Sequence, residues 1–390
     1  MNEAYIVAAV RSAAGRRGGR LKDWHPVDLA AAVIDALLDR SGADPEMIDD
    51  VIMGCVGQIG EQSTNVGRNA ILASRLPETV PGTTVDRQCG SSQQALHFAA
   101  QAVMSGAMDV VIAAGVESMS RIPMGLSQTL PASNGYGRYM SPRMQARYPE
   151  VAFNQFQSAE RIGREHHLTK EDFDQFGFES QVKAATATKS DCFEAEILPL
   201  EITLPDGTRD LHMIDEGIRF DASLEAIRGV RPIIEGGMLT AATSSQMGDA
   251  AAGLMVVNER GLKMLGIKPL VRIRHMSVMG GDPIIMLGVP LAATDRALAR
   301  AGMKISDIDL YEVNEAFAPI PLAWLRHTGA DPARLNVHGG ASALGHPLGS
   351  SGAKLMTTLI HALHRRGKRF GLQTMCEGGG LANVTIIERL

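Results

Sequence analysis

The chain has 390 residues, of which 45% are hydrophobic and 21% are charged, and its formal net charge is −5. These values are typical of an ordinary globular protein long enough for two or three domains, and a net negative charge gives no electrostatic footprint for nucleic acid. No stretch reaches the roughly 18 apolar residues that a membrane-spanning helix needs, so we expect neither a nucleic-acid partner nor a membrane partner.

The four cysteines are spread along the chain without a CxxC pair: Cys55, Cys89, Cys192 and Cys376. This spacing predicts neither a zinc site nor a disulfide framework. The N-terminus also lacks the pattern of a secretory signal. We therefore expect a cytoplasmic protein without a bound metal.

The first elements in chain order alternate between strands and helices. We expect a strand at residues 5–10, a helix at 27–40 and a strand at 50–56. The basic, glycine-rich stretch at residues 11–22 has no Walker pattern, so we interpret it as a solvated loop rather than a phosphate site. A further helix follows residue 89 and ends at Gly106, and the apolar run 108–116 predicts a strand covered on both faces.

Cys89 stands where that further helix is expected to begin. Apolar residues recur at helical spacing from Leu96 to Val103, and the small residues of Gly90-Ser91-Ser92 suit a helix start. The positive end of a helix lowers the pKa of a thiol, and its free N–H groups can hold an oxyanion. We therefore expect a reactive Cys89, the alternative being a small buried cysteine that packs the helix start.

Residues 119–244 differ in amino-acid composition from the residues before them. They are richer in polar residues, methionine and proline, and one helix is clear, at residues 170–187. Long insertions of this kind commonly cover the ligand site of an α/β scaffold. The apolar run 250–257 then returns to the pattern of the first part.

The last third of the chain repeats the first. Residues 36–54 resemble residues 297–314, and Gly42 and Gly302 are separated by 260 positions. A helix at 355–366 and a strand at 370–375 continue the register. We predict an α/β fold of two duplicated halves, with residues 1–118 and 245–268 in the first half, 119–244 as an inserted loop-rich domain and 269–390 in the second half.

Three more stretches carry reactive side chains. Asn314 follows a predicted strand, His346 precedes a proline in a glycine-rich loop, and Cys376 is followed by Glu377 and three glycines. Each has an ordinary explanation, as a strand-end cap, a structural histidine or a turn. Together with Cys89 they supply a nucleophile, a base, a proton donor and backbone N–H donors.

These motifs resemble those of the thiolase family, which comprises acetyl-CoA acetyltransferases and 3-ketoacyl-CoA thiolases. CGSS at Cys89, NEAFA at Asn314, GHP at His346 and CEGGG at Cys376 follow the order and spacing of that family across the whole chain. The resemblance implies a layered αβαβα fold in which the inserted domain binds coenzyme A. It also implies a homodimer or homotetramer.

The resemblance implies a role for each residue of the site. Cys89 becomes acylated, His346 takes its proton, and Cys376 moves the second proton. One oxyanion hole consists of His346 and a water held on Asn314, and the other consists of the backbone N–H groups of Cys89 and Gly378. The coenzyme A thioester is the substrate, and no further cofactor is required.

The resemblance also implies contacts to the substrate. Ser245 takes the position of a pantetheine-contacting serine, and Arg219 that of an adenine or phosphate contact. Met286 and Phe317 match residues that line the acyl pocket, although packing in the core is an alternative role for both.

Departures from the family pattern bear on the substrate. Asn154-Gln155-Phe156 stands where the short-chain biosynthetic branch has His-Met-Gly. We therefore expect a degradative thiolase that cleaves a 3-ketoacyl-CoA, with a biosynthetic acetoacetyl-CoA thiolase as the alternative. Cys376 argues against a ketoacyl synthase or hydroxymethylglutaryl-CoA synthase relative, and the complete residue set argues against a non-catalytic acyl-CoA carrier. We expect Glu377 to point away into an ion pair rather than to act on Cys376.

Overall fold

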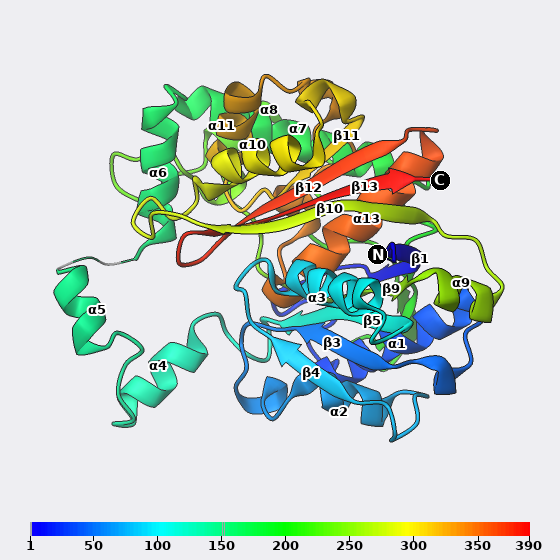
Figure 1. Ribbon diagram of the computed structural model, residues 1–390. Helices are drawn as coiled ribbons and strands as arrows, with labels where there is room; N and C mark the ends of the chain where they lie inside the picture. Colours follow the sequence, from blue (N-terminus) through cyan, green and yellow to red (C-terminus); the bar gives the residue numbers. More distant parts are fainter. Residues whose placement is uncertain (1, 150, 152) are drawn as a thin grey trace.

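A continuous β-sheet runs through the molecule. The structure is a computed structural model and describes residues 2–149, 151 and 153–390. The sheet has the strand order β11-β12-β13-β10-β1-β9-β5-β3-β4, with the short strands β2 (Gly15–Arg16) and β6 (Ile197–Leu198) paired to β9 and β1 (Figure 1). One half contains β1 (Tyr5–Ser12), β3 (Asp50–Gly54), β4 (Gly82–Val85), β5 (Val110–Ser118) and β9 (Gly248–Val257). The other half contains β10 (Val271–Gly280), β11 (Leu310–Val313), β12 (Phe370–Glu377) and β13 (Leu381–Arg389).

The two halves of the sheet have the same internal pairing. In the first half β3 runs parallel to β5, and β5 and β1 both run antiparallel to β9. In the second half β11 runs parallel to β12, and β12 and β10 both run antiparallel to β13. The helices α3 (Ser91–Ser105) and α13 (Ser351–Arg365) begin 260 residues apart, 351 minus 91, and they end 260 residues apart. These correspondences confirm the predicted duplication.

The helices form layers on both sides of each half-sheet. Figure 1 shows α3 and α13 between the two halves, while α1 (Pro26–Ser41) and α2 (Val66–Ala73) cover the outer face of the first half. Helices α10 (Val289–Ala301) and α11 (Pro319–Thr328) cover the outer face of the second half. The core between the half-sheets includes Leu96 and Val103 of α3 and Met356 and Leu359 of α13, all at most 1% exposed. The predicted αβαβα layering is therefore correct, and its central layer is the pair α3 and α13.

The inserted segment contains more helices than its sequence pattern predicted. The expected helix is α7 (Lys170–Lys189), which begins with a capping box between Thr169 and Asp172. The other elements are α4 (Leu126–Ser133), α5 (Pro142–Arg147), α6 (Gln155–Glu165), α8 (Leu224–Arg228), β7 (Leu200–Thr203) and β8 (Arg209–His212). The sequence pattern thus made only one of these helices clear, and that helix is present. The signal for α6 was present, because Asn154 caps it and Phe156, Ala159 and Ile162 line one face.

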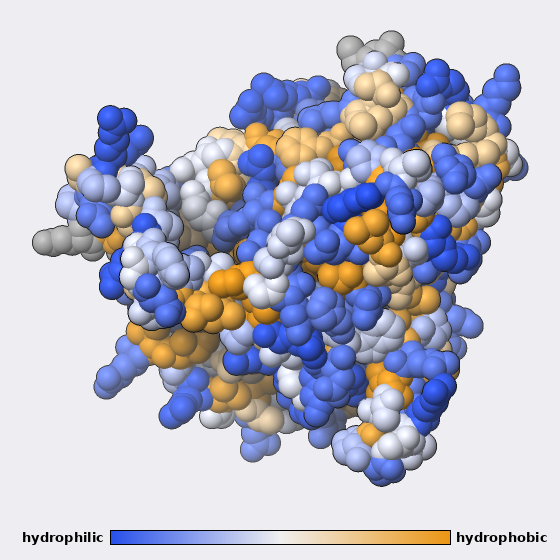
Figure 2. Space-filling view, turned by 90° about the horizontal axis from the view of Figure 1, so that it is seen from below, coloured by the Kyte–Doolittle hydropathy of each residue, from blue (hydrophilic) through white to orange (hydrophobic). Residues whose placement is uncertain are grey.

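Helices α4 and α5 form an arm that extends away from both half-sheets (Figure 1). The large apolar side chains exposed on this arm include Leu130, Tyr136, Tyr139 and Met144. Figure 2 shows apolar surface at the side of the molecule where the arm meets the body.

Two short helices lie outside the arm, α9 (Glu259–Leu265) and α12 (Ala341–Leu344). Among the described residues, no helix is both long enough and apolar enough to cross a membrane.

Candidate active site

A tight turn between β4 and α3 carries Cys89. Gln88, the residue before it, has a φ of 49°, a conformation that is uncommon for a residue with a side chain. The hydroxyl of Ser91 accepts a hydrogen bond from the Arg87 N–H at 2.9 Å and donates to the Gln88 carbonyl at 2.6 Å, which holds the turn closed. Gly90 is the N-cap of α3. Cys89 therefore stands one residue before the helix cap, as the helical spacing predicts.

The environment of Cys89 does not favour a thiolate in the free protein. Burial is the main cause that raises the pKa of this thiol to about 12, and the carboxyl of Glu377 adds to the effect. The backbone N–H groups of Gly378 and of Cys89 itself lower this pKa, but by less. The expectation of a lowered pKa is therefore wrong, because burial outweighs the helix terminus. A base must remove the proton as the sulfur attacks.

His346 lies in the loop between α12 and α13, and its ring is buried. Its Nδ1 lies 2.6 Å from the Ser351 hydroxyl, which itself donates to the Pro347 carbonyl at 2.8 Å. The hydroxyl thus accepts from Nδ1–H, and Nε2 keeps its lone pair. Burial, followed by the charge of Lys354, lowers the pKa of His346 to about 4. The imidazole is therefore neutral at pH 7 and can accept a proton at Nε2.

The first turns of α3 and α13 lie against each other. The Ala353 N–H of α13 donates to the Ser92 hydroxyl of α3 at 2.9 Å. A Cβ placed on Gly352 would lie only 2.2 Å from the Gln93 nitrogen, so a side chain there would separate the helices. The turn with Cys89 and the loop with His346 lead into these two helix starts. The duplication thus places the two groups at the same point of the molecule.

Asn314 directly follows β11, and Cys376 lies near the end of the neighbouring parallel strand β12. Val313 at the end of β11 pairs with Thr374 of β12. The side chains of Asn314 and Cys376 therefore lie near the same ends of these two strands. The Asn314 Nδ2 lies 3.4 Å from Nε2 of His346, whereas its buried Oδ1 has no hydrogen-bond partner within the described part of the chain. Burial, the nearby Cys89 and Glu377 raise the pKa of the Cys376 thiol well above its usual range. Cys376 is therefore a protonated thiol beside Cys89 at neutral pH.

The turn after β12 places backbone N–H groups beside Cys89. A Cβ on Gly378 would lie 2.9 Å from Oε1 of Gln88, the residue before Cys89. Gly379 and Gly380 have φ angles of 83° and 77°, which favour glycine. The Gly378 and Cys89 N–H groups are the two backbone donors that lower the pKa of the Cys89 thiol. The same two donors suit an oxyanion formed at a carbon bonded to this sulfur.

Glu377 does not form the ion pair that we expected. Its side chain is fully buried, and neither carboxyl oxygen has a hydrogen-bond partner among the described residues. It raises the pKa of Cys89 and Cys376, so it faces the site rather than pointing away. By contrast, Glu315 accepts hydrogen bonds from Ser180 of α7, Asn336 and Ser342 of α12, and it holds these segments together.

Three of the four expected substrate contacts lie close to this centre. The Ser245 N–H donates to the Ala316 carbonyl at 2.9 Å, which places Ser245 beside the NEAFA loop. Met286 and Phe317 are buried in the same apolar cluster as Cys376. Arg219 is exposed on the inserted segment, where its backbone N–H donates to Gln181 at 2.7 Å, and among the described residues no hydrogen bond or ion pair joins its side chain to the cysteines.

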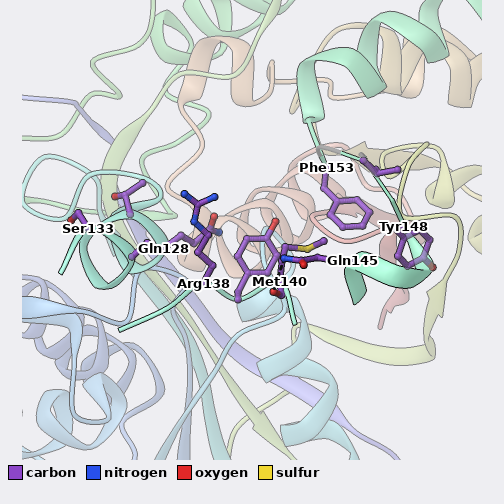
Figure 3. Close-up of a pocket in the computed structure, with 11 residues that line it drawn as sticks. Gln128, Ser133, Arg138, Met140, Gln145, Tyr148 and Phe153 are labelled. Carbon is purple, nitrogen blue, oxygen red and sulfur yellow. Dashed lines mark hydrogen bonds between the residues drawn. The ribbon is translucent and has the colours of Figure 1, made fainter. Parts of the chain in front are cut away.

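Aromatic residues of the inserted segment extend the apolar cluster. The rings of Phe156 and Phe317 lie 5.4 Å apart, edge to face, and Phe153 packs against the same cluster. Phe153 also lines a cavity of about 660 Å³ between α4 and α5 (Figure 3). Tyr148, whose ring lies 5.5 Å from that of Phe153, lines the same cavity. The cavity therefore adjoins the cluster that contains Cys376.

Sequence reasoning missed two groups that act on His346. Ser351 holds its Nδ1, and Lys354, which is buried, donates from Nζ to the Leu344 carbonyl at 2.9 Å. Both stand on α13, three residues apart and hence on one face. The serine-rich start of this helix directly after the GHP motif was the available signal.

In the described residues, no group of three or more His, Cys, Asp or Glu has the geometry of a metal site.

The chain matches known proteins over its full length. Residues 4–260 match the thiolase N-terminal domain, and residues 267–389 match the thiolase C-terminal domain. The steroid 3-ketoacyl-CoA thiolase FadA6 of Mycobacterium tuberculosis is 48% identical over 392 residues, which cover 100% of this chain and 95% of that protein. A 3-ketoacyl-CoA thiolase of Enterobacter sp. is 40% identical over 397 residues, with all of both chains covered.

Solved structures of thiolases have the same fold. The acetyl-CoA acetyltransferase of Bacillus anthracis superposes with a TM-score of 0.91 at 35% identity, and human mitochondrial 3-ketoacyl-CoA thiolase with a TM-score of 0.90 at 32% identity. Both comparisons cover 100% of this chain and 99% of the solved chain. With both family domains matched in order, the chain belongs to the thiolase family.

Proposed function

We propose that this protein is a degradative thiolase, which cleaves a 3-ketoacyl-CoA with coenzyme A into acetyl-CoA and a shortened acyl-CoA. The observation that carries the proposal is the meeting of two protonated thiols, Cys89 and Cys376, with the neutral imidazole of His346 and the backbone donors at Gly378. The names of the two relatives above, 3-ketoacyl-CoA thiolase and steroid 3-ketoacyl-CoA thiolase, also support cleavage rather than condensation.

In the first half-reaction the sulfur of Cys89 attacks the 3-keto carbon. Nε2 of His346 takes the thiol proton, and the N–H groups of Cys89 and Gly378 hold the tetrahedral oxyanion. The bond between C2 and C3 then breaks, and its electron pair forms the enolate of acetyl-CoA. His346 and a water on Asn314 stabilise the enolate oxygen, while Cys376 gives its proton to C2. Acetyl-CoA leaves, and Cys89 carries the shortened acyl group.

The second half-reaction regenerates the two thiols. The thiolate of Cys376 takes the proton of coenzyme A, whose sulfur attacks the thioester on Cys89. The same two N–H groups hold the second oxyanion. Cys89 leaves as a thiolate and regains its proton from His346, so the enzyme returns to its starting state. Every proton that one group releases is accepted by another.

For the acyl group we propose a bulky or ring-bearing substrate. Phe156 packs on Phe317 at the acyl cluster, and Phe153 joins this cluster to the cavity of about 660 Å³. Such a cavity falls within the size range of small-molecule sites. The relative at 48% identity is named as a steroid 3-ketoacyl-CoA thiolase, which supports a ring-bearing acyl group.

We further propose a cytoplasmic homodimer or homotetramer in which Ser245 and Arg219 contact coenzyme A. Strand β4 lies at an edge of the sheet, and an edge strand is a natural site for pairing with a second copy. All four cysteines are free thiols, as expected in a reducing compartment. Light scattering would test the oligomeric state, and coenzyme A affinity of Ser245→Ala and Arg219→Ala would test the contacts.

The test of function is kcat/KM for thiolysis across a panel of 3-ketoacyl-CoAs. The panel includes acetoacetyl-CoA, straight chains of six or more carbons and ring-bearing acyl groups. The proposal predicts a higher kcat/KM for larger substrates, because each buried methylene contributes roughly 0.8 kcal/mol. A preference for acetoacetyl-CoA would support the biosynthetic alternative, and no turnover with any substrate would support an acyl-CoA carrier.

A further inference from the structure

The carboxyl of Glu377 lies over the start of helix α3, beside both reactive cysteines. Glu377 follows Cys376 on β12, and a Cβ placed on Gly90 would lie 2.0 Å from its Oε1. Glycine at the position after Cys89 therefore leaves room for this carboxyl, which a larger residue would displace. The same carboxyl raises the pKa of the thiols of both Cys89 and Cys376. When the carboxyl is ionised, its charge thus acts directly on the reacting sulfur atoms.

Few charged groups face this carboxyl. The turn before α3 contributes Arg87, which lowers the pKa of Glu377, and Asp86, which acts on Cys89. Among the described residues, Nε of Arg87 and both carboxyl oxygens of Glu377 have no hydrogen-bond partner. Burial is the main influence; it outweighs the charge of Arg87 and the backbone N–H of Asn383, which both lower the pKa of Glu377, and raises that pKa to about 8. A buried carboxyl without a partner is strongly disfavoured as an anion, so it is neutral at pH 7.

The duplication supplies an internal comparison for this residue. Glu117 stands 260 positions before Glu377, at the same place on β5, and Gly349 stands 260 positions after Cys89. Oε2 of Glu117 accepts from the Gly349 N–H at 2.9 Å, so the first-half carboxyl lies against the counterpart of Cys89. It also accepts from the N–H groups of Val56 and Gly57 and from the Gln62 side chain.

The two related carboxyls therefore differ in one respect. Glu117 is held by four donors, whereas Glu377, beside the nucleophile, has no partner among the described residues. Four donors stabilise the structure around Glu117. The Glu377 carboxyl is not held by donors in this way, and when it is ionised its charge acts on Cys89.

We propose that Glu377 is a positioning residue that controls Cys89 and Cys376 through its charge. The neutral carboxyl permits negative charge on the Cys89 sulfur and on the oxyanion held by the Cys89 and Gly378 N–H groups, and the ionised carboxyl opposes both. The effect on turnover rests on the function proposed above, whereas the effect on the thiol of Cys89 does not depend on it.

The direction of the pH dependence follows from the sign of the charge. Below pH 8 Glu377 is protonated, and the site bears no extra charge. As the pH rises through 8, a negative charge appears beside Cys89, so thiolate formation and oxyanion binding both become harder. Activity should therefore fall above this pH instead of rising as Cys89 becomes easier to deprotonate.

The experiment compares the protein with Glu377→Gln, Glu377→Val and the matched control Glu117→Gln. Two quantities are measured against pH: kcat/KM for thiolysis, and the rate at which iodoacetamide alkylates Cys89, followed by peptide mass spectrometry. At about pH 9.5, alkylation and kcat/KM should both be roughly tenfold higher in the two Glu377 variants than in the unmodified protein. Glu117→Gln should keep the unmodified pH profile and unfold at a lower temperature.

Superimposable pH profiles of the unmodified protein and both Glu377 variants would overturn the proposal. An equal change in Glu117→Gln would overturn it as well, because the effect would then not be specific to the site. Faster alkylation in the Glu377 variants without thiolysis in any variant would support the charge effect and contradict the proposed function. The two failures are thus distinguishable.

Discussion

The hydroxyl of Ser351 lies 2.6 Å from Nδ1 of His346 and directs the other ring nitrogen into the site. Because that hydroxyl donates its own hydrogen to the Pro347 carbonyl, Nδ1 must carry the ring hydrogen. Nε2, 3.4 Å from Asn314, is then the proton acceptor. The first turn of α13 thus sets both the tautomer and the direction of the base.

Ser351→Ala should lower kcat by roughly 10- to 100-fold with a small effect on KM, because the ring is free to adopt the wrong tautomer. Steady-state thiolysis measures both constants. Ser350→Ala is the matched control, since the Ser350 hydroxyl also donates to Pro347, at 3.2 Å, without contacting His346. Equal losses in the two variants would show that the loop, not the tautomer, matters.

Lys354→Met should move the acid limb of kcat/KM to higher pH. His346 accepts a proton only when it is neutral, and the Lys354 charge contributes to the lowering of its pKa to about 4. Without that charge the pKa rises, so the protonated, inactive form persists to higher pH. Lys354→Arg keeps the charge and should keep the limb. Identical acid limbs in the two variants, both shown to be folded by thermal unfolding, would contradict this prediction.

Cys376→Ala should still accept an acyl group on Cys89, because attack and cleavage of the C2–C3 bond use His346 and the backbone donors and solvent can protonate C2. Turnover should fall by roughly 10²- to 10⁴-fold, because no thiolate then takes the proton of coenzyme A. Quenched samples analysed by mass spectrometry would show the accumulated adduct. Cys192→Ala, at a half-buried cysteine of the inserted segment, serves as the control and should retain full activity. Unchanged turnover in Cys376→Ala would mean that another group moves this proton.

Local sequence pattern predicts the position of Cys89 and the duplication, because helical spacing and a fixed offset depend on neighbours along the chain. It fails for the pKa of Cys89, because burial and Glu377, which is 288 residues away (377 minus 89), determine that value. The same holds for Glu377 itself, whose lack of a partner follows from tertiary packing. The position of Arg219 in its motif likewise does not predict how far its side chain lies from the two cysteines.

Phe153→Ala should lower kcat/KM for bulky 3-ketoacyl-CoAs by roughly 5- to 100-fold and leave kcat/KM for acetoacetyl-CoA nearly unaffected, since packing of an apolar acyl group against this half-buried ring contributes about 1–3 kcal/mol. Phe153 joins the acyl cluster to the cavity. The two-carbon acetyl group that acetoacetyl-CoA transfers to the enzyme does not need this cavity. Tyr136→Ala, at an 85% exposed position of the same arm, should change neither value. Equal losses for both substrates would place the effect outside acyl recognition.

Peptide mapping of the acyl-enzyme tests the central claim most directly. The protein is mixed with a 3-ketoacyl-CoA, quenched in acid and digested, and the mass shift of the shortened acyl group is located among the four cysteine peptides. Attack by the sulfur at the start of α3 predicts the adduct on Cys89 and its absence in Cys89→Ala. An adduct on Cys55, Cys192 or Cys376, or one that persists in Cys89→Ala, would contradict the account.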